Sequence, residues 1–122
     1  MKKINRLKKN HDIAEIVQKR QKFSRDNFIV YYQKTEAEIS KIAFSVSKKY
    51  GNSVERNKAK RIARSICQKI IKEVKNYNFV IVIKLNSKNK EYIELEQELL
   101  FIFKMIIKRQ VKGDNNDKNK KI

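Results

Sequence analysis

The chain has 122 residues and a formal net charge of +18, with 31 Lys and Arg against 13 Asp and Glu, one Cys and no Pro. This length suits one domain, and so large a positive charge predicts a polyanionic partner, either nucleic acid or an anionic membrane surface. One Cys excludes a disulfide framework within the chain, and the lack of a long apolar run or a signal-peptide core predicts a soluble, cytoplasmic protein.

The first 25 residues carry nine Lys or Arg against two acidic residues, so this segment attracts phosphates. Between about residues 9 and 20, Ile13, Ile16 and Val17 recur at helical spacing. This spacing predicts a short amphipathic helix near the N-terminus.

Two segments, residues 28–33 and residues 41–47, have the alternating pattern of strands. Both faces of the first strand carry rings, and filling the sheet is the simplest role for Tyr31. The second strand is expected to turn large side chains to the core and small ones outward, namely Ile42, Phe44 and Val46 against Ala43, Ser45 and Ser47. Small outward side chains leave room for a ligand on the sheet, although Ala and Ser also occur on ordinary solvated strands.

A long helix is predicted to begin just after Gly51 and to run to about Lys75, a length of roughly 35 Å. Asn52 or Ser53 can act as the N-cap, and Glu55 is placed to close a capping box. One face is apolar and is expected to pack on the sheet: Ala59, Ile62, Ala63, Ile66, Cys67, Ile70 and Val74. Another arc is polar and mostly cationic: Arg56, Asn57, Lys60, Arg61 and Arg64.

The basic arc has two interpretations. A charged helix face is usually only a solvated face, and a chain so rich in Lys must show some clustering. However, three of the seven Arg lie between residues 56 and 64. Because the planar guanidinium fork suits phosphates and base edges better than Lys does, this placement favours RNA binding. The helix start, beside Lys48 and Lys49, is a second expected anion site.

The remaining chain predicts one more strand and one more helix. Residues 79–83 form a β-branched and aromatic run typical of a strand buried on both faces, often parallel to its neighbour. A final helix is expected from about Glu91 to Lys108, with acidic residues first and basic residues last, in accord with the helix dipole. The polar segment 113–122 is predicted to be a disordered basic tail, outside a domain that covers residues 1–112.

Nothing in the sequence indicates a catalytic centre or a metal site. The sole histidine, His11, has no cysteine or carboxylate pair at an obvious ligand spacing, and two Gly cannot make a phosphate-binding loop. Acidic residues are scattered or gathered in the last helix, away from the basic arc. The isolated chain is therefore expected to have no catalytic residues.

The segment SVSKKYGNSVERNKAKRIAR resembles the central motif of the protein component of bacterial ribonuclease P. That motif has a Ser-Lys-Lys strand end, a Gly-Asn turn and an Arg-Asn-(Arg/Lys)-x-Lys-Arg-x-x-Arg helix. The matching positions are Ser47, Lys48, Lys49, Gly51, Asn52, Arg56, Asn57, Lys58, Lys60, Arg61 and Arg64. Likeness in NRLKKNHDI and FIVYY extends the resemblance over roughly residues 4–109.

The resemblance implies an α+β fold, a single-domain α/β sandwich with the order α-β-β-β-α-β-α. A central mixed sheet of about four strands would be packed by the long basic helix and the C-terminal helix, with a short N-terminal helix. The βαβ crossover would be left-handed, whereas crossovers are nearly always right-handed. The residues themselves do not reveal the hand.

The resemblance also implies a function. A catalytic RNA subunit, using Mg²⁺, removes the 5′ leader of precursor tRNA, while the protein is an auxiliary subunit that binds the catalytic RNA and the leader. The RNA-binding residues would be Lys48, Lys49, Asn52, Arg56, Asn57, Lys58, Lys60, Arg61 and Arg64. A leader cleft would include Ile13, Val17, Tyr31, Ser45 and Ser47. At the positions of Ile13 and Val17 the family carries aromatic residues. The aliphatic side chains of Ile13 and Val17 cannot stack on bases as aromatic rings do.

Two alternatives come from other functional classes. A ribosomal or other structural RNA-binding protein would share this composition, and the RNA that co-purifies would separate the two. A membrane-surface protein is less favoured, because the basic helix lacks the Trp, Phe and Leu of interfacial helices. Neither a membrane nor a small-molecule substrate is therefore expected as a partner.

Overall fold

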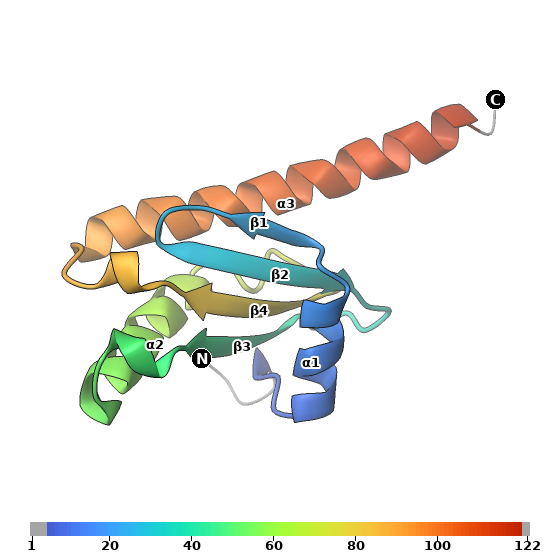
Figure 1. Cartoon of the computed structure of the whole chain (residues 1–122). Coiled ribbons are helices and arrows are strands. Elements are labelled where there is room, and N and C mark those ends of the chain that lie inside the picture. The colour runs from blue at the N-terminus through green and yellow to red at the C-terminus, as the bar shows by residue number, and fades with distance from the viewer. Residues whose placement is uncertain (1–4, 121–122) are drawn as a thin grey trace.

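Three α-helices, two short 3₁₀ helices and a four-stranded sheet are present in the part of the chain that the computed structural model describes (Figure 1). Residues 5–120 are described, with side chains for residues 5–109. The elements are α1 (Asn10–Gln18), β1 (Lys22–Ser24), β2 (Phe28–Lys34), β3 (Lys41–Val46), η2 (Lys48–Tyr50), α2 (Ser53–Gln68), β4 (Tyr77–Ile83), η3 (Leu85–Ser87) and α3 (Tyr92–Lys120). No helix in these residues is long and apolar enough to span a membrane.

The strands lie in the order β1-β2-β4-β3. β4 pairs antiparallel with β2 and parallel with β3, which confirms a mixed sheet. As its continuous apolar run predicts, β4 is buried on both faces, with Phe79, Val80 and Ile81 at most 1% exposed.

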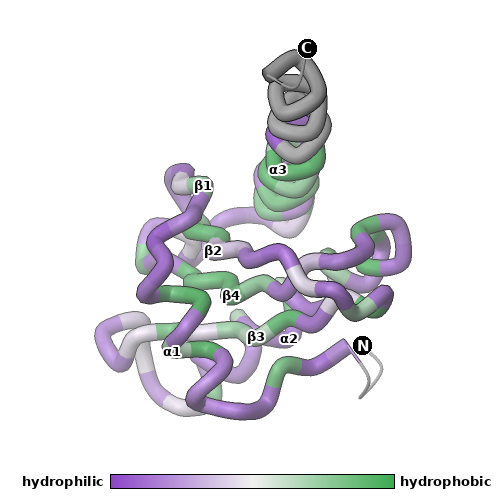
Figure 2. Tube along the Cα trace, turned by 90° about the vertical axis from the view of Figure 1, so that its right-hand side faces the viewer, coloured by the Kyte–Doolittle hydropathy of each residue, from purple (hydrophilic) through white to green (hydrophobic). Residues whose placement is uncertain are grey.

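The crossover from β3 through α2 to β4 is left-handed, as the resemblance implies. In Figure 1 both strands point to the left and β4 lies above β3. Figure 2 shows α1 on one side of the sheet, and α2 and α3 on the other, which is the rear face in Figure 1. The chain therefore leaves β3, passes behind the sheet through α2 and returns to the parallel strand β4 above β3. This path is a left-handed connection.

Two apolar clusters hold these layers together. The larger lies between the sheet and the helices α2 and α3, and includes Ile66, Phe79 and Phe103. The smaller lies under α1 and includes Ile16, Ala43 and Val80. The predicted alternation along β3 is therefore confirmed, because Ile42 enters the first cluster and Ala43 the second. Cys67 is a buried free thiol, as predicted, and burial raises its pKa.

The helix boundaries correct two expectations. α2 has 16 residues and ends at Gln68, so it is ~24 Å long rather than reaching Lys75. Residues 69–73 form turns instead. α3 continues past the predicted end near Lys108, with a helical backbone to Lys120, and the predicted disorder of residues 113–122 stays a prediction. No side chain is described for residues 113–120, and residues 121 and 122 lie outside the described residues. The domain boundary at residue 112 stays a prediction.

Candidate nucleic-acid interface

The start of α2 is fixed by the predicted capping box. Asn52 Oδ1 accepts a hydrogen bond from the Glu55 N–H (2.9 Å), and Glu55 Oε1 accepts one from the Asn52 N–H (3.2 Å). A Cβ at Gly51 would lie 2.6 Å from Glu55 Oε1, so glycine makes room for this carboxylate. A hydrogen bond from Lys88 lowers the pKa of Glu55. A carboxylate therefore lies at this helix end, and the anion site expected beside Lys48 and Lys49 stays a prediction.

The predicted RNA-binding residues on α2 form one surface, which we call the basic surface: Arg56, Asn57, Lys58, Lys60, Arg61 and Arg64. Asn57, Lys58 and Arg61 are exposed, and the other three are half-buried. Four ion pairs occur among residues 5–109, and none of them uses a cation of this surface. Its positive charge is therefore available to a partner.

Two arginines of this surface have unused hydrogen-bonding capacity. The Arg64 guanidinium lies over the Phe44 ring (5.7 Å from Cζ to the centroid) and has no hydrogen-bond partner among the described side chains and backbone. Arg56 donates to Ser53 Oγ (3.3 Å), but its Nε, like that of Arg64, is buried without a partner there. Because an unsatisfied charged donor is costly, a phosphate oxygen that reached these groups would be well bound.

An open groove joins the basic surface to the N-terminal segment at the edge of β3. Its volume is about 270 Å³. Lys60 and Arg64 line it from α2, Arg6 and Lys8 from the N-terminal segment, and Ile13 from α1. Four cations and no carboxylate line this edge groove, so it favours a polyanion.

The predicted leader-cleft residues lie on the face of the sheet that carries α1. Ile13, Val17 and Tyr31 are half-buried and pack together on the smaller apolar cluster. Tyr31 is paired in register with Val80, and Val80 with Ala43, so they form one row across the sheet. Ser45 is exposed in the next row, and Ser47 is exposed just beyond the end of β3. The structure thus brings the first three residues together and places the two serines beside them.

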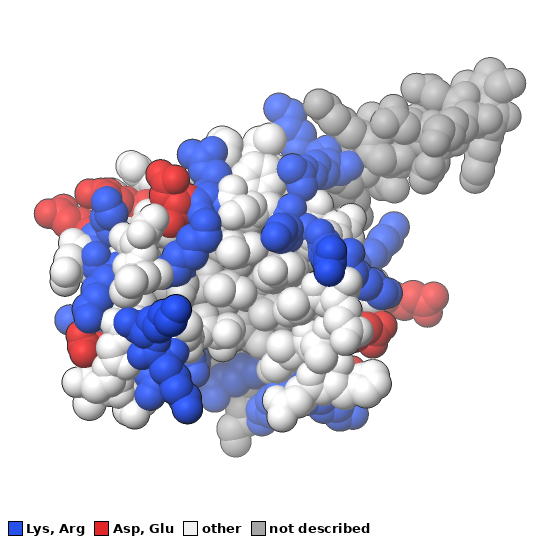
Figure 3. All heavy atoms as spheres, viewed as in Figure 1, with Lys and Arg blue, Asp and Glu red and all other residues white. Residues whose placement is uncertain are grey.

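This face has an uncharged centre bordered by cations. Figure 3 shows uncharged side chains over the middle of the face, with Lys and Arg on both sides. Ile29 and Val82 are half-buried in the same row as Ser45, and only the strand pairing reveals that they belong to this face. Lys22 lies over the Tyr31 ring at 5.7 Å. A flexible strand with stacked bases and outer phosphates suits such a surface.

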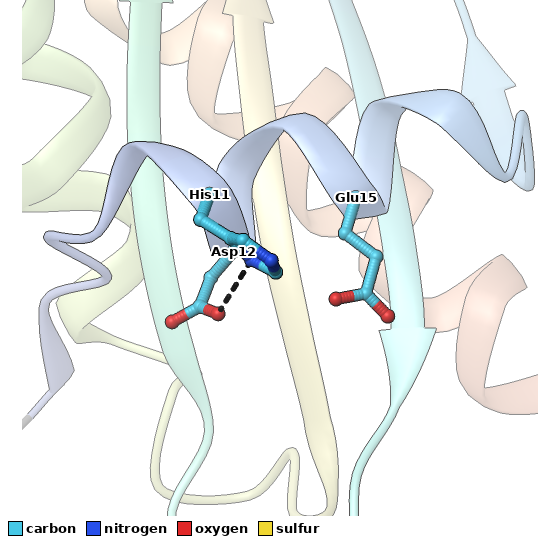
Figure 4. Close-up of side chains that lie close together, drawn as sticks. All are labelled: His11, Asp12 and Glu15. Atoms are coloured by element: carbon cyan, nitrogen blue, oxygen red, sulfur yellow. Dashed lines mark ion pairs between the residues drawn. The ribbon is translucent and has the colours of Figure 1, made fainter.

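One group of side chains could offer ligands to a metal ion. His11, Asp12 and Glu15 have ligand atoms within 4.8 Å of one another on α1 (Figure 4). The expectation that His11 has no such neighbours is therefore wrong, because residues i and i+4 share a helix face. However, Glu15 pairs with Lys19 (3.7 Å), and Asp12 with His11 (3.7 Å). The expected lack of a dedicated metal site stays a prediction.

Comparison with known proteins identifies the family. The model of the family described as Ribonuclease P matches residues 1–107. The ribonuclease P protein component of Bacillus mycoides is 35% identical over 114 residues, which cover 92% of this chain and 99% of that protein. That of Streptococcus agalactiae is 30% identical over 86% of this chain and 96% of its own.

Solved structures agree with this match. The RNase P protein of Staphylococcus aureus superposes with a TM-score of 0.78 at 28% identity, covering 85% of this chain and 96% of that one. The RNase P protein of Thermotoga maritima, at 23% identity and a TM-score of 0.71, shares the fold over 78% of this chain and 91% of its own. The chain therefore belongs to the ribonuclease P protein family, the auxiliary protein components of a ribonucleoprotein endoribonuclease.

Proposed function

We propose that the chain binds the catalytic RNA subunit of ribonuclease P through its basic surface and binds the 5′ leader of precursor tRNA on the sheet face beside α1. The edge groove is the observation that carries this proposal, because four cations without a carboxylate connect the two surfaces. The alternative role of a ribosomal or other structural RNA-binding protein is not favoured by the family match.

The chain's part in the reaction is then positioning and charge neutralisation. Arg61 and Arg64 bind phosphates of the folded RNA subunit, and their charge reduces the repulsion between two polyanions. The uncharged rows of the sheet hold the single-stranded leader without reading its bases specifically. Substrate is thereby held at the RNA subunit, which performs the hydrolysis.

On this proposal Mg²⁺ belongs to the RNA subunit. Mg²⁺ prefers carboxylate and phosphate oxygens, and no carboxylate lines the edge groove. The group of His11, Asp12 and Glu15 lies on α1, and its two carboxylates already pair with neighbouring side chains. These observations support the proposal that the RNA subunit holds the catalytic Mg²⁺.

RNA affinity should depend steeply on salt. If about six phosphates are contacted, the logarithm of the association constant falls against the logarithm of salt concentration with a slope of roughly −4 to −5. Filter binding of an in vitro transcribed ribonuclease P RNA across a KCl series, at constant Mg²⁺, measures this slope. A slope near zero would remove the electrostatic account.

Replacement of Tyr31 by Ala should weaken binding of leader-bearing precursor tRNA by about 5- to 10-fold, because one base then loses a stacking partner. The mature tRNA, which has no leader, should be bound almost as well as by the wild type. The holoenzyme is titrated with both RNAs to compare the two losses. Tyr31→Phe keeps the ring and serves as the matched control, and equal losses for both RNAs would rule out the leader assignment.

A further inference from the structure

A cavity of about 220 Å³ lies between α2, η3 and α3, and it shares only Lys58 with the surfaces assigned above. Its walls are apolar: Ala59 and Ala63 of α2, Phe28 and Ile83 of the sheet, and Leu95 of α3. The cavity is open because α2 places two alanines here, whereas Ile66 of α2 and Ile70 of the turn that follows it fill the space farther along the core. A cavity that has apolar walls and opens to solvent is suited to a flat hydrophobic ring.

The rim of this cavity is cationic. Lys58, Lys88 and Lys90 lie on it, and Glu55 is the one acidic residue. Glu55 is neutralised by Lys88 at 3.0 Å, whereas Lys58 and Lys90 have no ion pair among residues 5–109. Two unpaired positive charges thus border an apolar hollow.

Asn89 adds a polar group at the rim. Its backbone has φ +68°, a conformation that Asn tolerates better than most residues. Its side chain lines the cavity and is exposed to solvent. An amide offers donors and an acceptor side by side, which matches the edge of a nucleobase.

We propose that this cavity receives one unstacked nucleotide of the RNA partner, with its base between the apolar walls and its phosphate beside Lys58 and Lys90. The proposal rests on the proposed function. It adds a site at which the protein recognises the shape of the RNA. Pockets for drug-sized ligands measure about 300–1,000 Å³, so this smaller cavity admits one ring system and not a helix. Folded RNA is recognised largely through such splayed bases. Lys58 also belongs to the basic surface, so one RNA can occupy both.

The test fills the cavity without changing any charge. Ala59→Met places a longer side chain in it, and Met is compatible with a helix. We expect the affinity for an in vitro transcribed ribonuclease P RNA to fall by at least about 5-fold, the worth of one stacked base. The salt slope and the melting temperature should not fall. Ala37→Met, at an exposed loop position, is the matched control and should bind like the wild type.

A second variant tests whether weaker binding by Ala59→Met could result from misfolding alone. Asn89→Gly suits the positive φ and removes only the amide, and it should also weaken binding. Base-specific chemical probing should show one RNA nucleotide that the wild type protects and the Ala59→Met variant leaves reactive. Wild-type affinity and protection in both variants would overturn the cavity proposal while the proposed function stands. Salt-independent binding by the wild type would instead overturn the proposed function itself.

Discussion

Joint replacement of Arg61 and Arg64 by Ala is expected to weaken binding of the ribonuclease P RNA by about 100-fold. A hydrogen bond to a charged group contributes about 1.5–3 kcal/mol, so two such losses at the lower end of this range amount to roughly two orders of magnitude. The fold should lose little, because Arg61 is exposed and Arg64 has only the ring of Phe44 as a cation–π partner. The melting temperature should therefore fall by about 5 °C or less. Filter binding and thermal unfolding of the same samples measure both quantities.

The matched control removes the same charge elsewhere. Lys104→Ala with Lys108→Ala takes two exposed cations from α3 and should weaken RNA binding far less. Arg61→Lys with Arg64→Lys keeps the charge but loses the guanidinium forks, and should give an intermediate affinity. Equal losses in the α3 and α2 variants would mean that net charge alone drives binding, and the basic surface would lose its special role.

Replacement of Phe79 by Ala should lower the free energy of unfolding by about 3–5 kcal/mol, the usual cost of removing a buried phenyl ring. Phe79 is 0% exposed in the central strand. Its ring lies edge-on to Phe103 of α3 with centroids 5.0 Å apart. Since small domains have about 5–15 kcal/mol of stability in total, this variant should be near the limit of folding. Urea unfolding followed by circular dichroism measures the loss.

Phe101→Ala is the control for this prediction, because Phe101 is also a phenylalanine but lies on α3 and is 40% exposed. It loses an edge-on contact with Phe23 and the cation–π contact of Arg25 at 4.6 Å. We expect a loss of about 1–1.5 kcal/mol. If both variants were destabilised equally, the sheet and α3 would not share the core that the structure shows.

The sequence predicts those features that depend on neighbouring residues. The start of α2 is one, because Asn52 and Glu55 lie three positions apart and bond each other's backbone. Its end is not, because Ile70 and Val74 continue the helical spacing and are only 7% and 2% exposed. Tight turns follow Gln68, with the Ile70 N–H bonded to the Cys67 carbonyl at 3.1 Å. Apolar spacing therefore predicts which side chains are buried in the core. It does not predict whether the backbone at those residues has the hydrogen bonds of a helix or of a turn.

Features that depend on distant residues could not be predicted in this way. β1 has three residues and one apolar side chain, Phe23, so it has no visible period. Its place is set by pairing with β2 and by Arg109, whose guanidinium lies 4.6 Å from the Phe23 ring. The edge groove likewise needs Arg6 beside β3, which a bridge to Ile42 provides. The assignment of residues to RNA contacts stays a prediction, since charge and exposure alone do not name a ligand.

The strand order has a consequence for how the protein is made. β4 lies between β2 and β3 but follows both of them in the chain. On the ribosome, the hairpin of β1 and β2 can close early, whereas β3 has no strand beside it in the sheet until residue 83 has been added. α2 is synthesised before β4 and α3, which supply part of the surface that covers its apolar side. At about 5–20 residues per second, β4 is completed roughly one to three seconds after α2, so the sheet closes only after the cationic helix has been synthesised.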